Sequence, residues 1–136
     1  MNYLFIASDA LNRGAIYAAA GFTGAAIHGY LGTRYATPLL TGVVSASAAG
    51  ISSVAIKHFF YRVFPQVSMP KTTIVLLSLY IGSLAATQVG LPIEIEQCVI
   101  QIVSGGAAGG IAIGFVRAAV ADAVRARDFL RARGLI

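Results

Sequence analysis

Ser104-Gly-Gly-Ala-Ala-Gly-Gly-Ile-Ala-Ile-Gly114 is the stretch that decides the fold, and it lies inside an uncharged run from Gln97 to Val116. On a helix, the four-residue spacing of Gly106, Gly110 and Gly114 puts all three glycines on one stripe. In water each glycine would weaken that helix by about 1 kcal/mol relative to alanine. In a bilayer the helix persists, because its backbone must satisfy its own hydrogen bonds, and the bare stripe becomes a contact surface. The stretch therefore predicts an integral membrane protein built by close helix packing.

The composition agrees with a membrane location. The chain has 136 residues, enough for one domain, and it is 57% hydrophobic and only 11% charged. Soluble domains are about 45–50% apolar and about 25% charged. Cys98 is the single cysteine, which excludes an internal disulfide and a multi-cysteine metal site. No cofactor is expected.

Four apolar stretches are long enough to cross about 30 Å of hydrocarbon. Their expected limits are residues 14–33, 38–60, 72–89 and 93–116. Pro38 and Pro70 stand where the second and third helices begin, and Gly90 with Pro92 separates the third from the fourth. The sequence predicts an all-α, four-helix transmembrane bundle over residues 1–116. The first dozen residues are interpreted as a short interfacial or packed segment, not as a removed leader.

Basic residues determine the expected orientation. Nine of them fall on one side of the predicted membrane, whereas Arg34 alone falls on the other, beside Glu94 and Glu96. The nine are Arg13, Lys57, Arg62, Lys71, Arg117, Arg125, Arg127, Arg131 and Arg133. The positive-inside rule therefore predicts both termini on the cytoplasmic, or equivalent inner, side.

The fourth helix is expected to extend beyond the membrane as a basic tail over residues 117–136. Asp122, Arg125, Asp128 and Arg131 recur every three residues with alternating sign, a spacing that supports an exposed helix. The tail is interpreted as a solvated helix, or alternatively as a docking element for a soluble or capsid-like partner or for anionic lipid.

Each predicted span carries a stripe of small residues, typical of helix packing in membranes. The stripes are Gly21, Ala25 and Gly29; Gly42, Ala46 and Gly50; Ser78, Gly82 and Ala86; and Gly106, Gly110 and Gly114. The last span has a second small stripe, formed by Gly105, Gly109 and Ala112. Two contact faces on one helix indicate one for the bundle and one for another subunit, either a copy of this chain or a different membrane protein.

A few polar residues form a candidate polar site near the outer ends of the spans. His28 is the one ionisable side chain well inside a span, where a titratable group is a candidate for proton relay. Its candidate neighbours on that side are Gln88, Glu94, Gln97 and Gln101. A structural role, with the glutamines as interhelical hydrogen-bonding groups, is the favoured interpretation.

Basic residues also provide candidate contacts with lipid or a partner. They are Lys57, Arg62, Lys71, Arg125, Arg127, Arg131 and Arg133. The segment from Lys57 to Arg62 is typical of an interfacial anchor in which long basic side chains reach the headgroups. Nucleic acid is not expected as a partner, because no basic stripe with interleaved aromatic residues is present.

Catalytic motifs are missing from the sequence. There is no H-E-x-x-H, G-x-S-x-G or phosphate-loop pattern, and Glu94 and Glu96 would point to different faces of a helix. His28, His58 and Cys98 fall at different ends of their spans, so no metal site is predicted. The sequence is therefore not expected to encode an enzyme.

The expected function is that of a non-catalytic, multi-pass membrane protein that packs into a larger assembly, as an accessory subunit or as a structural protein of a virus-associated membrane. A small oligomeric pore of the holin or channel type is the first alternative, with Thr41, Ser45, Ser52, Ser78 and Gln88 as candidate lining residues. A proton-linked carrier using His28 is the second. Residues Gly105 to Gly110 resemble four-helix subunits of the mitochondrial inner-membrane translocase type, but over six residues the resemblance implies nothing about function.

Overall fold

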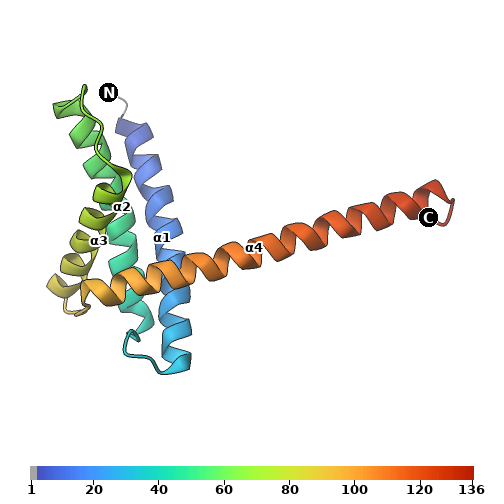
Figure 1. Ribbon diagram of the computed structural model, residues 1–136, viewed down its shortest axis with the longest axis horizontal. Helices are drawn as coiled ribbons and strands as arrows, with labels where there is room; N and C mark the ends of the chain where they lie inside the picture. The colour runs from blue at the N-terminus through green and yellow to red at the C-terminus, as the bar shows by residue number, and fades with distance from the viewer. Residues whose placement is uncertain (1–2) are drawn as a thin grey trace. The chain divides into compact units, whose positions relative to one another are not determined.

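The computed structural model describes residues 3–136 and is all-helical there, with four helices and no strand (Figure 1). Helix α1 spans Tyr3–Leu31, α2 Leu39–Val63, α3 Lys71–Gln88 and α4 Ile95–Ala132. The chain divides into two compact units, residues 1–106 and 107–136. The first contains α1, α2, α3 and the start of α4, and the second contains the rest of α4. The predicted all-α class is confirmed.

The helices end where the sequence supplies a terminator. Gly32, Gly90 and Gly134 follow α1, α3 and α4 with φ of 65°, 82° and 67°, a left-handed conformation that costs glycine nothing. After each glycine, the next backbone N–H donates to a carbonyl five residues earlier, as in Leu91 to Ala86 at 2.9 Å. This pairing satisfies carbonyls that the last turn leaves free. Helix α2 instead ends just before Pro65.

The predicted and observed helices differ most at the N-terminus. Helix α1 begins at Tyr3, whereas the sequence predicted a span from about Gly14 preceded by a separate segment. Residues 3–13 contain neither glycine nor proline, so nothing interrupts the helix there. Asp9 and Arg13 do not break it either, because neither side chain is buried. The other three helices begin within two residues of the predicted limits.

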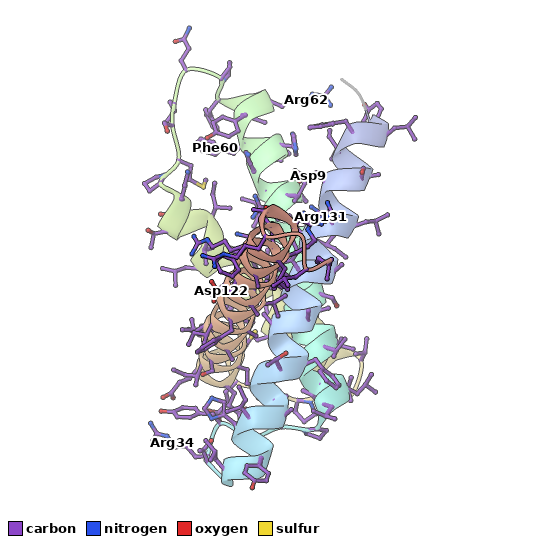
Figure 2. The ribbon with its side chains drawn as sticks, turned by 90° about the vertical axis from the view of Figure 1, so that its right-hand side faces the viewer. Asp9, Arg34, Phe60, Arg62, Asp122 and Arg131 are labelled. Carbon is purple, nitrogen blue, oxygen red and sulfur yellow. The ribbon has the colours of Figure 1, made fainter. Side chains whose placement is uncertain are left out.

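Helix α2 packs against α1 on one side and α3 on the other. Figure 1 shows the α1–α2 loop and the α3–α4 loop at one end of this group, and the start of α1 and the α2–α3 loop at the other. Basic Arg62 therefore lies near Asp9 at one end, whereas Arg34 lies at the opposite end (Figure 2). Arg62 and Arg34, which the sequence assigns to opposite sides of the predicted membrane, thus lie at opposite ends of this group.

Glycines allow the three helices to touch backbone to backbone. A Cβ added at Gly21 would collide with the Gly42 carbonyl, and one at Gly50 would lie 2.5 Å from the carbonyl oxygen of Arg13. A Cβ at Gly82 would collide with the carbonyl of Ser45. Such positions accept only glycine unless the helices move apart.

The first part of α4, up to Gly106, runs across α1 (Figure 1). A Cβ at Gly105 would collide with the carbonyl oxygen of Ala20, and one at Gly24 would collide with the carbonyl of Gln101. The two helices therefore approach closely at a crossing made of glycine on both sides. Whether all four helices form a membrane-spanning bundle remains a prediction.

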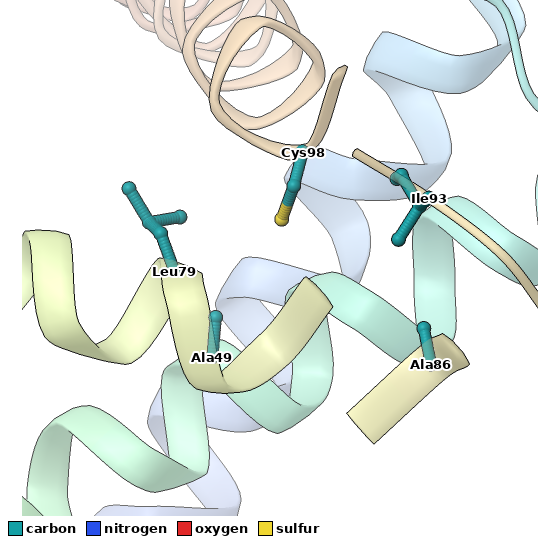
Figure 3. Close-up of a cluster of buried hydrophobic side chains, with 5 residues drawn as sticks. All are labelled: Ala49, Leu79, Ala86, Ile93 and Cys98. Atoms are coloured by element: carbon teal, nitrogen blue, oxygen red, sulfur yellow. The ribbon is translucent and has the colours of Figure 1, made fainter. Parts of the chain in front are cut away.

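The interior of the first unit contains small and polar side chains. Its largest fully buried side chains are Gln101, Thr41, Cys98, Ser45 and Ser78. The buried apolar cluster is also built largely from small residues, with Ala49 and Ala86 beside Leu79, Ile93 and Cys98 (Figure 3).

Large apolar side chains lie on the outside of this unit. On α3, Leu76 is 54% exposed and Tyr80 52%, while Ser78 between them is fully buried. Phe22 on α1 and Ile51 on α2 are likewise exposed. The interior keeps a few large apolar residues, such as Ile74 and Leu79, but many more lie on the surface, where they form an extended apolar area.

Two helices among the described residues, α2 and α4, are long and apolar enough to cross a membrane by length and composition. The sequence predicted four. Helix α1 carries Asp9, Arg13 and His28, and α3 has only 18 residues, beginning with Lys71. The charged and polar residues of both helices lower their mean hydropathy below that expected of a spanning helix. Helix α3, in addition, is barely long enough to span.

Gly105 and Gly106 form a matched pair for testing the α1–α4 crossing. We expect Gly105→Ala to destabilise the protein by about 1–3 kcal/mol, because its methyl group collides with the α1 backbone. Gly106→Ala, which meets no atom within 4 Å, should be neutral or stabilising by up to about 1 kcal/mol. Unfolding of the detergent-solubilised protein, followed by circular dichroism, measures both. Equal effects of the two substitutions would contradict the crossing.

Candidate functional site

A set of polar side chains binds the α1–α2 loop, residues 32–38, to the start of α4. We call this set the loop clamp. Its members are His28 on α1 and Glu96, Gln97, Gln101 and Ser104 on α4. All of them lie in the first unit.

Gln101 is the most buried member of the clamp, with 1% of its surface exposed. Its Nε2 donates to the Tyr35 carbonyl at 2.6 Å and to Thr37 Oγ1 at 2.8 Å. Its Oε1 has no hydrogen-bond partner among the described residues. That oxygen lies 3.0 Å from where a Cβ would stand on Gly42. It therefore faces the Gly42 backbone, where a weak Cα–H contact is the available interaction.

Both ring nitrogens of His28 have hydroxyl partners. Nδ1 lies 2.9 Å from Thr33 Oγ1, and Nε2 lies 2.9 Å from Ser104 Oγ. The Tyr35 ring packs edge-on at 5.7 Å between centroids. Hydroxyls donate or accept, so this environment satisfies either neutral tautomer. The contacts join α1, the loop and α4, which is what a structural histidine does.

Arg34 of the α1–α2 loop and Glu96 of α4 form the exposed part of the loop clamp. Arg34 Nη2 lies 3.2 Å from Glu96 Oε1 and donates to the Tyr35 hydroxyl at 2.7 Å, and that hydroxyl donates to Glu96 at 3.3 Å. The hydrogen bond to Tyr35, followed by the nearby Glu96 charge, raises the pKa of Arg34, so the guanidinium stays cationic. Exposed pairs of this kind contribute about 0–1 kcal/mol.

Gln97 links the start of α4 to the loop. Its Oε1 accepts from the backbone N–H of Glu94 at 3.0 Å, as in a capping box, and its Nε2 donates to the Arg34 carbonyl at 3.3 Å. One side chain therefore satisfies a free N–H at the helix start and a carbonyl of the loop.

The structure brings together three residues of the predicted polar site, His28, Gln97 and Gln101. The side chains of Gln88 and Glu94 are exposed and have no hydrogen bond among the described residues. Sequence reasoning missed the hydroxyl of Ser104 on α4 and the loop partners Thr33, Tyr35 and Thr37. Loop residues follow no periodic pattern that could have indicated them. Their roles depend on how the loop folds against α4.

The predicted packing stripes differ in what they contact. Those of the second and third predicted spans are buried throughout, as are Gly21 and Ala25. A Cβ at Gly29 or Gly106 would meet nothing within 4 Å, and within their own unit Gly110 and Gly114 have no neighbour. Instead, Gly105 from the second small stripe makes the contact between α4 and α1. A role of Gly106, Gly110 and Gly114 in packing against another chain stays a prediction.

Three basic residues of the C-terminal unit have local partners. Arg125 lies 3.7 Å from Asp122, Arg127 lies 3.3 Å from Asp128, and the Arg133 guanidinium stands 4.6 Å from the Phe129 ring centre. Arg131 has no ion pair among the described residues. Lys57, Arg62 and Lys71, in the first unit, likewise have none.

The described residues contain no group of three or more His, Cys, Asp or Glu side chains able to hold a metal ion. Cys98 is buried. The comparisons add no relative: no protein-family model matches the chain, and neither a curated protein nor a solved structure matches it.

Gln101 provides a test of the clamp. Gln101→Leu should destabilise the protein by about 1–3 kcal/mol, because it takes the donor from the part-buried Tyr35 carbonyl and from Thr37 Oγ1. Gln88→Leu, on an exposed side chain without a hydrogen bond, should change stability by less than about 0.5 kcal/mol. Detergent-phase unfolding measures the difference. A Gln101→Leu protein as stable as Gln88→Leu would show that the clamp contributes nothing.

Proposed function

We propose that this chain is a non-catalytic, multi-pass membrane protein that packs into a larger membrane assembly as an accessory or structural subunit. The observation that carries the proposal is that many large apolar side chains of the first unit are exposed, while its largest fully buried side chains are mostly polar. Its interior holds Gln101, Thr41, Ser45 and Ser78 beside a few larger apolar residues such as Leu79, while many leucines, phenylalanines and isoleucines lie outside. Water disfavours that arrangement, and hydrocarbon favours it.

Buried hydroxyls fit the same environment. Ser45, Ser78 and Ser83 each donate to a carbonyl three residues earlier in their own helix, at 3.3, 2.7 and 2.9 Å. These donors are satisfied without water and without a partner helix. Small side chains then permit the close helix contacts that stabilise membrane proteins, where apolar burial between helices contributes little.

The proposal includes four membrane crossings with both termini on the inner side. Helix α2 packs along α1 and α3, so a bilayer that holds α2 would surround its neighbours. Helix α1 is about 43 Å long, more than the thickness of the hydrocarbon layer. Helix α3 is about 27 Å long, close to that thickness. Polar groups of α1, such as Asp9 and Arg13, lie near an end, where side chains reach the interface.

Labelling of single cysteines distinguishes four crossings from two. In a Cys98→Ala background, Ser68→Cys marks the α2–α3 loop and Ala132→Cys marks the end of α4. Four crossings put both positions on the same side, so a membrane-impermeant maleimide should label both or neither in vesicles of known sidedness. If only α2 and α4 cross, the two positions lie on opposite sides and exactly one is labelled.

Assembly is proposed to use the stripe of Gly106, Gly110 and Gly114. No atom of their own unit covers these glycines, and such a stripe allows the backbone of another helix to approach closely. The same helix carries Gly105 on the neighbouring face, in contact with α1. One face of α4 is thus used within the chain, and the adjacent face is offered to a partner.

Substitution of Gly110 tests this role. Gly110→Leu should abolish co-purification with the partner, or the shift to larger size in mild detergent, because the side chain separates the backbones. Ala119→Leu adds similar bulk at an exposed position on the opposite side of the helix, well beyond the α1 contact at Gly105, and should preserve assembly. His28→Gln, which keeps a donor and an acceptor, should preserve it too.

The two alternatives predict other outcomes for the same preparations. A pore would release dye or ions from liposomes, a result that would contradict the packing proposal. Thr41, Ser45 and Ser78 are buried within the chain, so they do not favour a pore lining in a single copy. A carrier using His28 would lose proton-coupled uptake in His28→Gln while its assembly stayed intact.

A further inference from the structure

We propose that a pocket between α1, α2 and α3, at the end of the first unit opposite Arg34, binds the phosphate group of an anionic ligand. We call it the basic pocket. It has a volume of about 380 Å³. Its polar lining consists of Asp9, Arg13, Tyr17, Ser53, Lys57, Tyr61 and Lys71. The volume falls within the range of small-molecule sites, about 300–1,000 Å³.

Each of the three helices contributes one cation to this pocket. Arg13 comes from α1, Lys57 from α2 and Lys71 from the first position of α3. Cations that are distant in sequence thus line one cavity, although like charges repel. A cavity with this lining gains from an anion, which removes the repulsion.

None of the three cations has an ion-pair partner among residues 3–136. Asp9, the one acidic residue of the lining, has its closest basic group in His58, with Oδ2 3.8 Å from Nε2. Asp9 therefore forms no ion pair with Arg13, Lys57 or Lys71. The balance of charge in the lining is three positive against one negative.

The residues of α1 that line the pocket lie on the same face of the helix as the residues that contact α4. Arg13, Tyr17, Ala20 and Gly24 follow one another at spacings of three and four, which places them on one side of the helix. Ala20 and Gly24 contact α4, whereas Arg13 and Tyr17 line the pocket. Tyr17 also packs against the buried cluster around Ala49 and so separates the pocket from the core.

Phosphate is the anion that suits this lining best. It accepts several charge-assisted hydrogen bonds at once, and lysine and arginine are its usual partners in proteins. Tyr17 and Tyr61 bring hydroxyl donors and ring surface for the part of the ligand that carries the phosphate.

The ligand is either a phospholipid headgroup or a soluble phosphate ester. The lipid case rests on the proposed membrane location, and the soluble case does not. We expect a fluorescent phosphatidic acid in detergent micelles to bind the purified full-length chain and to be displaced by unlabelled phosphatidic acid but not by phosphatidylcholine. Displacement by glycerol 3-phosphate as well would identify a soluble ester as a sufficient ligand.

Neutral substitutions measure the contribution of the pocket. Lys57→Gln and Lys71→Gln should each weaken binding about fivefold, and the double variant about 25-fold, from the usual worth of a basic residue near an anionic lipid. Asp9→Asn should strengthen binding. The matched control is Arg117→Gln, which removes the same charge outside the lining and should change affinity less than about twofold. Circular dichroism verifies that each variant is folded.

Three results would overturn the proposal. They are no saturable binding of either probe, a double variant within about twofold of the unchanged chain, or a loss in Arg117→Gln equal to that in Lys57→Gln. The last result would mean that charge spread over the surface attracts the ligand. Assembly is measured separately through Gly110→Leu, so a failed pocket and a failed assembly role give different patterns.

Discussion

Close approach of helix backbones is the constraint on which the rest of the first unit depends. At Gly21, Gly50 and Gly82, the neighbouring helix occupies the space that a side chain would fill. Where the contacts are this short there is room only for small residues, so Ala, Ser and Thr are frequent in the interior. The larger apolar side chains are then displaced to the outside, where only a nonpolar surrounding accommodates them without cost. The close packing of the helices and the exposure of many large apolar side chains therefore depend on the same small residues.

Polar groups in this interior are few, and most are satisfied locally. The buried serines bond to their own helices, while His28 and Gln101 bond across elements. The two kinds of contact have different effects. A serine bonded within its helix tolerates any neighbour of suitable shape, whereas a side chain bonded to a loop fixes one arrangement of the loop and the helix.

The sequence predicted much of the helical layout, for local reasons. Proline before α2 and α3, and glycine after α3, are signals that act on neighbouring residues, and the helices begin and end there. The glycine that contacts α1 was not singled out as the main stripe, because Gly105 and Gly106 are adjacent and only the fold determines which one faces a neighbour. The loop partners of Gln101 and the basic pocket were missed because they join residues distant in sequence.

The buried amide of Gln101 limits how α4 is turned about its own axis. A rotation by one residue, about 100°, would replace it with Ile100 or Ile102, neither of which donates a hydrogen bond. The part-buried Tyr35 carbonyl would then lose its donor, at a cost of about 1–3 kcal/mol. The glycine contact alone discriminates less, since a turn that replaces Gly105 with Gly106 would still present a glycine to α1. A single polar side chain thus selects one rotational setting among several that would pack almost equally well.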